Sequence, residues 1–467
     1  MTSTGIPASW TIVPLKELGD WSGGGTPSKA KAQYWQGGTI PWVSPKDMKT
    51  ERISDSEDHI TKEAVSHSTT SLINAGSVLI VTRSGILRHT LPVAVNSVSV
   101  TVNQDLKALT PRNGILAEYV AWALRAFSRD ILHTCSKQGT TVNSVETSKL
   151  LGFEIPVAPR GQQAKIVAEI EKQFSRLDEA VANLKRVKAN LKRYKASVLK
   201  AAVEGKLTEE WRKAHPDNEP ASKLLERILA DRRGKWTDKG KCKEPSALEV
   251  IDFPSLPKGW TWASLDQLSW DSSYGTSVKC SYNNSGPAVL RIPNIASGKL
   301  DLRDLKFAPD SYEVGRGDKL SAGDLLIIRT NGSRNLIGRS AVVRQPLPSA
   351  SAFASYLIRF RLAQQLEIIK WLSAIWDAEH FRVWIEKRAS TSAGQHNISM
   401  SVLARLPVPL PPLAEQDQIV SEVERRLSVI EALEAAVEAN LTRADRLRQS
   451  ILARAFSGNL AGTAGVA

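Results

Sequence analysis

The sequence Ser197-Val198-Leu199, followed by Gly205-Lys206-Leu207, returns 253 residues later as Ser450-Ile451-Leu452, followed by Gly458-Asn459-Leu460. The match extends without a gap over residues 163–207 and 416–460. In the first copy no Gly or Pro interrupts the stretch before Gly205. We therefore predict two long, related helices.

Both stretches carry apolar residues every seven positions, which is the spacing of a coiled-coil seam. The first seam consists of Ile170, Leu177, Leu184, Leu191 and Val198, flanked by Val167, Phe174 and Val181. The second consists of Val423, Ile430, Val437, Ala444 and Ile451, flanked by Val420, Leu427 and Leu441. The most available partner for each helix is the other copy, so we predict an antiparallel coiled coil, about 60 Å long at 1.5 Å per residue. The alternative is an amphipathic helix that packs on its own domain.

A globular region precedes each helix, and each region opens on a proline and a Trp-Thr pair, at Pro7 and Trp10 and again at Pro257 and Trp260. Apolar runs bounded by turn residues predict strands over 77–82, 93–102, 324–329, 340–343 and 356–362. Helical stretches are expected over 116–132 and 365–387. The expected fold class is α+β, with two mixed α/β domains joined by the two helices and related by a pseudo-twofold axis.

The predicted boundaries follow from this order. They place a first globular domain over 1–160, a first helix over 161–207, a connector over 208–256, a second globular domain over 257–412, and a second helix with its tail over 413–467. The connector contains one helical piece over 222–233, followed by a Lys-rich segment.

The composition is strongly basic, with 62 Lys and Arg against 48 Asp and Glu, a net charge of +14. Such an excess attracts polyanions, because neutralising phosphates releases counterions. Cys135, Cys242 and Cys280 lie far apart, which disfavours a disulfide framework or a zinc site. We find no leader-like segment and no apolar run that could cross a membrane, and we expect a cytoplasmic protein.

Several motifs together resemble the specificity subunit of type I restriction–modification systems. They are Pro-Pro-Leu-Ala-Glu-Gln at 411–416 before a heptad helix, the ending at 450–460, and a connector with Gly205-Lys206-Leu207, Trp211-Arg212 and the apolar run at 224–228. The resemblance covers nearly the whole chain. It departs from the family at 158–163, where the fuller proline motif is missing, and after Leu460, where the connector is not repeated.

The resemblance implies two target-recognition domains, each reading one half of a bipartite, asymmetric site in double-stranded DNA. The helices would serve as a spacer and as the dock for two methyltransferase subunits. Those subunits use S-adenosylmethionine to methylate adenine, and added motor–nuclease subunits would provide restriction. The chain itself is then a non-catalytic subunit that binds no cofactor and no metal.

Catalytic motifs support this interpretation by their absence from the sequence. There is no Asn/Asp-Pro-Pro-aromatic motif, no spaced His/Cys set, and the glycines at 23–25 lack the Gly-Lys-Ser/Thr of a phosphate loop. The carboxylates Asp55, Glu57 and Asp58 are expected on a solvated surface rather than in a nuclease site. A self-sufficient enzyme with an unfamiliar site, and a coiled-coil scaffold with incidental charge, remain the two alternatives.

Base reading needs Arg, Asn, Gln or hydroxyl side chains on well-held loops. The first candidates follow a Gly-plus-strand element that occurs in both domains, and Arg83 is matched there with Arg329. They are Arg83, Ser84 and Arg88 in the first domain and Arg329, Thr330, Asn331, Ser333 and Arg334 in the second. A second group comprises Lys46, Gln138, Thr140, Thr141, Arg291, Asn294, Gln395, His396 and Asn397. Ordinary turn-making is the alternative for every one of these residues.

The most basic stretch lies on the first helix, at Lys185, Arg186, Lys188, Lys192, Arg193 and Lys195. Charges on a coiled-coil helix normally line its solvated flanks, and we expect that role here. Contact with phosphates or with a partner subunit is the alternative.

Overall fold

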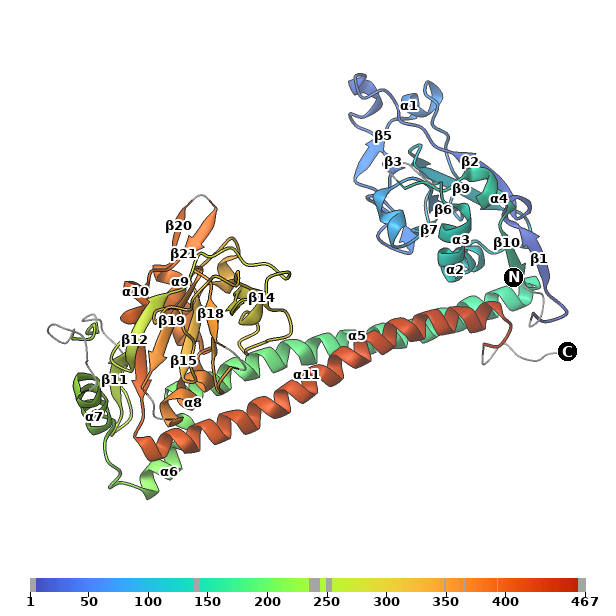
Figure 1. The fold of residues 1–467 in the computed structure, drawn as a ribbon. Coiled ribbons are helices and arrows are strands. Elements are labelled where there is room, and N and C mark those ends of the chain that lie inside the picture. The colour runs from blue at the N-terminus through green and yellow to red at the C-terminus, as the bar shows by residue number, and fades with distance from the viewer. Residues whose placement is uncertain are drawn as a thin grey trace. The chain divides into compact units, whose positions relative to one another are not determined.

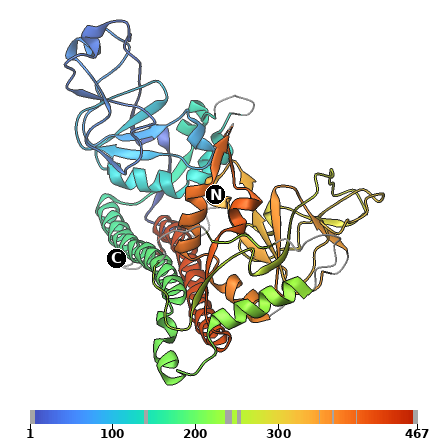
Figure 2. The same cartoon turned by 90° about the vertical axis from the view of Figure 1, so that its left-hand side faces the viewer.

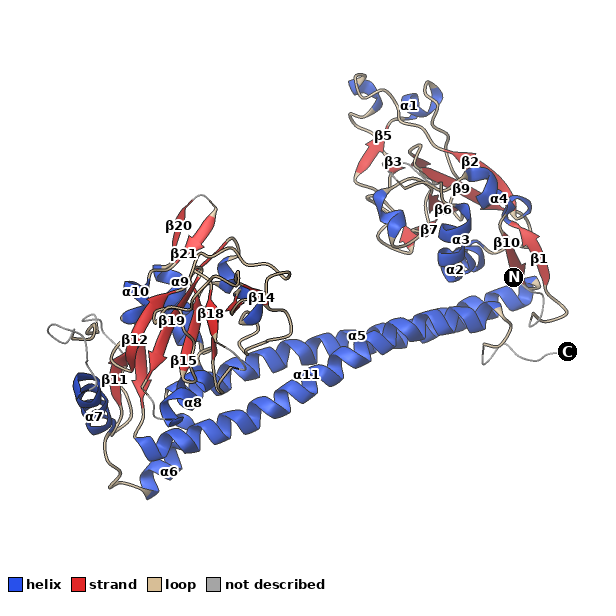
Figure 3. Cartoon of the chain, in the orientation of Figure 1, coloured by secondary structure: helices blue, strands red, loops and turns tan. Residues whose placement is uncertain are grey.

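The computed structural model describes residues 6–137, 143–234, 244–248, 254–347, 350–363, 366–392 and 394–460. The chain forms two compact units, one of Met1–Arg186 with Val437–Ala467 and one of Val187–Ala436. Each unit contains one globular domain and one part of each long helix (Figure 1). Helices and strands are mixed within both domains (Figure 3), so the predicted α+β class is confirmed.

The first unit is built on a five-stranded sheet in the order β2-β9-β6-β7-β4. Its strands are Gly19–Gly23, Leu106–Pro111, Val78–Val81, Val93–Asn96 and Arg52–Ile53. A smaller sheet contains β5 (Asp58–Ile60), β3 (Ile40–Val43) and β8 (Thr101–Val102), and β1 (Thr11–Pro14) pairs with β10 (Glu154–Val157). The helices are α1 (Lys62–Ser66), α2 (Ala117–Ala126), α3 (Ser128–Cys135) and α4 (Thr147–Gly152).

The second unit has a four-stranded sheet in the order β12-β19-β15-β17, with strands Ser269–Tyr274, Leu357–Leu362, Asp324–Ile328 and Ser340–Val342. Two three-stranded sheets accompany it, one of β14 (Lys306–Phe307), β13 (Ala288–Leu290) and β18 (Ser351–Phe353), and one of β16 (Thr330–Asn331), β21 (Gln395–Asn397) and β20 (Ser390–Ser392). β11 (Thr261–Ser264) pairs with β22 (Pro407–Leu410), as β1 pairs with β10. The helices of this domain are α8 (Leu366–Ile375), α9 (Glu379–Arg388) and α10 (Met400–Ala404).

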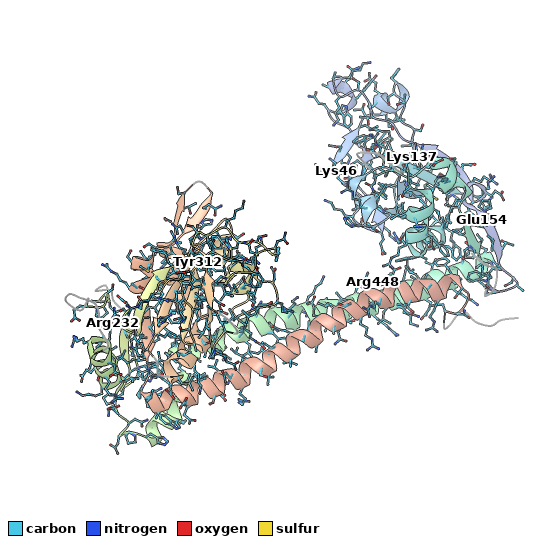
Figure 4. All side chains as sticks on the ribbon, viewed as in Figure 1. Lys46, Lys137, Glu154, Arg232, Tyr312 and Arg448 are labelled. Carbon is cyan, nitrogen blue, oxygen red and sulfur yellow. The ribbon has the colours of Figure 1, made fainter. Side chains whose placement is uncertain are left out.

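Two helices of 44 residues each, α5 (Arg160–Val203) and α11 (Leu413–Phe456), lie side by side (Figures 1 and 2). In the first unit, the start of α5 and the end of α11 share a core that includes Ile170 and Phe456. Arg448 of α11, labelled in Figure 4, forms an ion pair with Asp178 of α5 there. In the second unit, the end of α5 and the start of α11 share a core that includes Val198 and Val423. Opposite ends are therefore paired, and the predicted antiparallel arrangement is confirmed.

The predicted seam is the buried side of this pair. Ile170, Leu191 and Val198 on α5 are buried, as are Val423, Ile430, Val437 and Ala444 on α11. Leu177 and Leu184, in the middle of α5, are only half-buried. Burial of the seam against the second helix, in addition to the domain, favours the coiled coil over the single amphipathic helix.

The repeat can be followed to individual atoms at the start of each helix. Trp10 Nε1 donates to Gln162 Oε1 and Trp260 Nε1 donates to Glu415 Oε2, both at 2.9 Å. The next residues, Gln163 and Gln416, are buried, and each donates to a backbone carbonyl five positions earlier. The sequence offset of 253 therefore corresponds to equivalent positions in the two units.

The two long helices end at Val203 and Phe456, four residues before the matched stretches end at 207 and 460. The cause is Gly205 and Gly458, whose φ angles of 67° and 76° end the helix in the left-handed region that favours glycine. The connector then forms α6 (Glu209–Ala214) and α7 (Ala221–Gly234). α7 packs on the second domain through buried Leu224 and Ile228.

Two predicted helices are wrong in extent, because each is a pair of shorter helices. The stretch over 116–132 divides into α2 and α3 at Phe127, whose ring packs near Phe153 and Phe456. The stretch over 365–387 divides into α8 and α9, where Ala378 is extended and buried. The strand predicted over 93–102 likewise divides into β7 and β8. Tertiary packing at the break overrides the local helical pattern in both domains.

Candidate nucleic-acid interface

In the first domain, the loop after β6 meets the segment that leads into α4. β6 is a fully buried strand, and it delivers Arg83 and Ser84 to the surface at its end. Arg83 forms an isolated antiparallel bridge with Ser144, and the Ser84 amide donates to the carbonyl of Asn143 at 3.0 Å. The candidate residues at 83–88 therefore lie beside Asn143 and Ser144, which closely follow the candidates Gln138, Thr140 and Thr141 in the sequence.

Two side-chain hydrogen bonds connect the loop 83–88 to itself and to Asn143. The Ser84 hydroxyl accepts from the Ile86 amide at the start of a 3-10 helix, Gly85–Arg88. Arg88 Nε donates to Asn143 Oδ1 at 3.2 Å, while the side chains of Arg83 and Arg88 are exposed. Gln138, Thr140 and Thr141 lie outside the described residues. The loop thus presents two arginines from a well-held backbone.

The second domain brings the equivalent two loops together in the same way. β16, which follows β15, pairs with β21, which precedes α10, with Thr330 opposite Asn397 and Asn331 opposite His396. β20 adds a third strand, with Thr391 opposite His396. The carbonyl of Arg329 accepts from the Ile398 amide at 2.9 Å, as the carbonyl of Thr82 accepts from the Val145 amide at 2.7 Å.

This backbone equivalence corrects the predicted match of Arg83 with Arg329. Arg329 corresponds to Thr82, and Arg83 corresponds to Thr330, so the sequence match was wrong by one residue. A shift of one residue in an extended segment points the side chain to the opposite face. The two arginines therefore occupy different environments.

Arg329 is half-buried rather than displayed. Its guanidinium carbon lies 4.7 Å from the ring centroid of Tyr274, and Nη1 donates weakly to the Ser355 carbonyl at 3.4 Å. Its Nε is buried without a hydrogen-bond partner in the structure. Tyr274 is 41% exposed and its hydroxyl accepts from the Met400 amide at 3.0 Å, so it forms a fixed platform under the arginine. No pattern in the sequence identified Tyr274 as part of this site.

The tip that follows β16 is an exposed turn. Asn331 Oδ1 accepts from the Ser333 amide at 2.7 Å, which is the turn-making role that was the alternative for this residue. Arg334 is exposed, and its Nη2 donates to the Glu386 carbonyl at 3.3 Å. The segment is therefore ordered and carries a displayed cation next to amide and hydroxyl groups.

The early-loop candidates fit DNA contact less well. Lys46 Nζ lies 2.9 Å from Asp58 and 3.2 Å from Glu57, and the hydrogen bond that it donates to Asp58 raises the pKa of this lysine. Asp55 pairs in turn with His59 at 2.7 Å. The carboxylates predicted to be solvated surface are thus exposed or half-buried partners in ion pairs. Lys46 stays a candidate with a charge that is already partly neutralised.

Asn294 was a wrong candidate, because its side chain is only 1% exposed. Its Oδ1 accepts from the Arg291 amide at 2.8 Å, and its Nδ2 donates to the carbonyls of Asp301 and Asp304. Arg291 is also drawn into this loop, through Asp304, and its side chain is 13% exposed. Both residues shape the loop instead of offering atoms to a groove.

The basic stretch of α5 is exposed, apart from the half-buried Lys195, as predicted for the solvated flank of a coiled coil. Within the part of the chain that the structure describes, no group of three or more His, Cys, Asp or Glu side chains is gathered to hold a metal ion. Across the same residues, no helix combines the length and apolarity needed to cross a bilayer.

Comparisons of family, sequence and structure all find similarity to proteins of type I restriction–modification systems. A family model described as "Type I restriction modification DNA specificity domain" matches residues 7–193. The EcoKI specificity subunit of Escherichia coli K12 is 24% identical over 471 residues, which cover 98% of this chain and 91% of the relative. The EcoR124I/EcoR124II specificity subunit of E. coli is 46% identical over 167 residues, which are 36% of this chain and 41% of that relative's length.

Two solved structures share the fold. One comes from work on complex assembly and conformational transition of the type I R-M system, with a TM-score of 0.66 and 19% identity over 97% of this chain and 99% of the other. The other is the HsdS subunit of Thermoanaerobacter tengcongensis, with a TM-score of 0.53 and 18% identity over 97% and 98% of the two chains.

Proposed function

Because the chain belongs to the family of type I restriction–modification specificity subunits, we propose that it reads a two-part, asymmetric DNA sequence and positions adenine methyltransferase subunits on it. As a member of this family it is a DNA-recognition subunit that leaves catalysis to other subunits. The DNA that it would read lies in the cytoplasm of a bacterial cell, and we propose that it works there.

The proposal that the DNA site has two parts is supported by a pair of contacting loops that occurs in both domains. Each domain brings the loop after a buried strand against the segment before a short helix, through equivalent backbone hydrogen bonds. The side chains on the two clusters differ: Arg83 and Arg88 stand in one, and Asn331, Arg334 and His396 in the other. Because the two domains share the same backbone arrangement but carry different side chains on it, we expect the two half-sites to have different sequences.

The antiparallel helices supply the spacing in this proposal. Each recognition domain is continuous with the start of one helix, and the two starts lie at opposite ends of the helix pair. In this proposal the length of the helix pair sets the number of unread base pairs between the two half-sites. The basic residues along α5 would add phosphate attraction without sequence preference.

The partners proposed for the chain are double-stranded DNA, two methyltransferase subunits and, for restriction, motor–nuclease subunits. S-adenosylmethionine would be bound by the methyltransferase subunits and not by this chain. The outer faces of α5 and α11 carry exposed apolar residues, among them Tyr194, Val429, Leu433 and Leu447. Such residues on a helix pair support docking of further subunits, because exposed apolar patches favour association.

The experiment that tests the proposal is a methylome. The chain is expressed with the methyltransferase subunit of its own system in a host without adenine methylation, and modified adenines are mapped by single-molecule sequencing. The methyltransferase alone is the control. A two-part motif with an unspecified gap that appears only with this chain supports the proposal, and its absence from an intact, soluble complex contradicts it.

The two alternatives give different results in simple assays. A self-sufficient enzyme would methylate or cut DNA as the purified chain, without partners. A scaffold with incidental charge would bind protein partners with no DNA affinity. DNA binding whose affinity falls steeply with salt, together with no turnover by the purified chain, distinguishes the proposal from both.

A further inference from the structure

The three-stranded sheet of the second domain ends in a ribbon made by β20 and β21. The two strands pair antiparallel, with Ser390 opposite Asn397, Thr391 opposite His396, and Ser392 opposite Gln395. All three residues of β20 are exposed, and so is Gln395 (Figure 1 shows the ribbon at the edge of the domain). β16 supports β21 from its other side.

Core packing does not explain the ribbon. Its six strand residues are Ser, Thr, Ser, Gln, His and Asn, and none of them is apolar. The apolar anchors lie just outside, where Ile398 is 1% exposed and Trp384 and Ile385 of α9 are buried. A polar two-stranded ribbon is only marginally stable by itself. The buried residues at its base and the third strand, β16, therefore hold it in place, and burial of the ribbon itself does not.

The register shows which side chains share a face. Residues opposite each other on adjacent strands point to the same side of a sheet. Asn331, His396 and Thr391 therefore form a row across the three strands. Within that row the Thr391 hydroxyl bonds His396 Nδ1 at 2.9 Å, which leaves Nε2 as the other hydrogen-bonding atom of the ring.

The charges around the ribbon are also suited to DNA. Neither strand carries an acidic residue. Arg334 is exposed on the turn after β16, and Arg388 lies over the Trp384 ring at 4.3 Å, just before β20. Of the nearby acids, Glu386 is 3.4 Å from Arg382 and so is already neutralised by a cation. A polar ribbon flanked by cations can approach a polyanion without repulsion.

We propose that the ribbon of β20 and β21 enters the major groove of the second half-site end-on. Gln395, at the end of its strand, and His396, the next residue, then reach base edges although their side chains point to opposite faces of the ribbon. A two-stranded ribbon fits the major groove, and a Gln side chain pairs with adenine through two hydrogen bonds. Thr391 is the positioning residue, because it fixes the His396 ring. This inference rests on the proposed function and adds to it the element that reads one half of the site.

The test compares methylomes of the intact complex carrying Gln395→Ala, His396→Ala or Thr391→Val. Preference at one or two positions of the second half-site is expected to fall about 5- to 150-fold for Gln395→Ala, with the first half-site unchanged. Thr391→Val is expected to weaken preference at the same position as His396→Ala, while Thr391→Ser retains it. Gln345→Ala is the matched control, because Gln345 is exposed in the same unit but lies outside the ribbon.

Each outcome has one meaning. Unchanged preference in all three variants, with the two-part motif still present, overturns the ribbon inference and leaves the proposed function standing. Uniform weakening across all sequences also overturns it, because it marks phosphate contact in place of base reading. No two-part motif even with the unaltered chain counts against the proposed function itself. Thermal unfolding should be the same for Gln395→Ala and Gln345→Ala, since neither residue is buried.

Discussion

The indole Nε1 of Trp260 donates a hydrogen bond at 2.9 Å to Glu415, whose carboxylate is completely buried. The same carboxylate accepts from Thr208 and Arg212 of the connector. At the equivalent place in the first unit stands the neutral Gln162, bonded to Trp10. A charged residue thus occurs where the connector provides an arginine.

Arg212→Ala is expected to lower the free energy of unfolding by about 3–5 kcal/mol, because it leaves the Glu415 carboxylate buried without a cation. The measurement is urea unfolding followed by tryptophan fluorescence. Lys213→Ala, on the same helix, removes exposed pairs with Glu209 and Glu210 and should leave the free energy of unfolding nearly unchanged. Equal losses for the two variants would contradict the assignment.

A second test exchanges the residue types. Glu415→Gln retains an acceptor for Trp260 and places the same residue type there as Gln162 in the first unit. It should therefore lower the free energy of unfolding by less than Arg212→Ala does. Gln162→Glu puts a carboxylate at the half-buried first corner, where no arginine occupies the equivalent sequence position, and should destabilise by about 1–3 kcal/mol. If Gln162→Glu leaves the free energy of unfolding unchanged, the site around Gln162 is more hydrated than its contact with Trp10 suggests.

The seam of the helix pair is tested on α11. Ile430 is 1% exposed, and Ile430→Ala should cost about 2–5 kcal/mol through lost burial and the cavity that remains. Leu433 is one turn further and 47% exposed, so Leu433→Ala should leave unfolding nearly unchanged. Should Leu433→Ala instead reduce methyltransferase co-purification, the exposed face serves subunit docking, as proposed.

The role of the glycines that end the long helices is tested by substitution with alanine, which adds one methyl group. In Gly205→Ala the new Cβ would lie 2.6 Å from Pro257 Cγ, and alanine would have to adopt a φ of 67°. A loss of about 1–3 kcal/mol in thermal or urea unfolding is expected. Gly152→Ala is the control, because its Cβ would enter open space at an ordinary φ. A neutral Gly205→Ala would mean that the helix can end without the left-handed residue.

The candidate loops of the two domains can be tested separately. Arg83→Ala should relax only the first half-site of the methylated motif, and Arg334→Ala only the second, since each exposed arginine lies on one cluster. The methylome of each variant complex gives the result directly. If either variant weakens both halves alike, that arginine binds phosphates and not bases.

The spacer role is tested by length. Inserting seven residues into each helix, after Lys185 and after the equivalent Glu438, retains the heptad register while lengthening the pair by about 10 Å. The methylated motif should keep both half-sites and gain about three unread base pairs, at 3.4 Å per pair. An unchanged gap in a folded, active complex would refute the spacer proposal.

Local periodicity explains why the helices could be predicted from the sequence. The seam through Ile170 and Ile430 depends on neighbours seven residues away along the chain, and Gly205 and Gly458 end both copies through their own backbone preference. The divisions at Phe127 and Ala378 could not be predicted in this way. They depend on contacts with residues far away in sequence, such as Phe456.

The candidate site shows the same division between local and distant causes. Arg83, Arg88 and Arg334 were predicted from polar turns after apolar strands, and they are exposed. Asn294 was misjudged because an asparagine in a polar loop gives no sign of burial. Tyr274 was missed because its neighbour Arg329 lies far away in the sequence, between β15 and β16. The polar ribbon of β20 and β21 carries no apolar alternation, which is the signal by which strands are predicted.

The contacts at Gly205 and Gly458 bear on how each recognition domain can move. The end of α5 lies against Pro257, at the start of the second domain, and the end of α11 lies against Pro7, at the start of the first. Each domain is therefore joined covalently to the beginning of one helix and clamped at its own beginning by the end of the other. A domain held by a single bond can swivel about it, whereas two attachment points remove that rotation. The orientation of each set of candidate side chains relative to the helices of its own unit then depends on the helix ends, independently of the sequence that the loops carry.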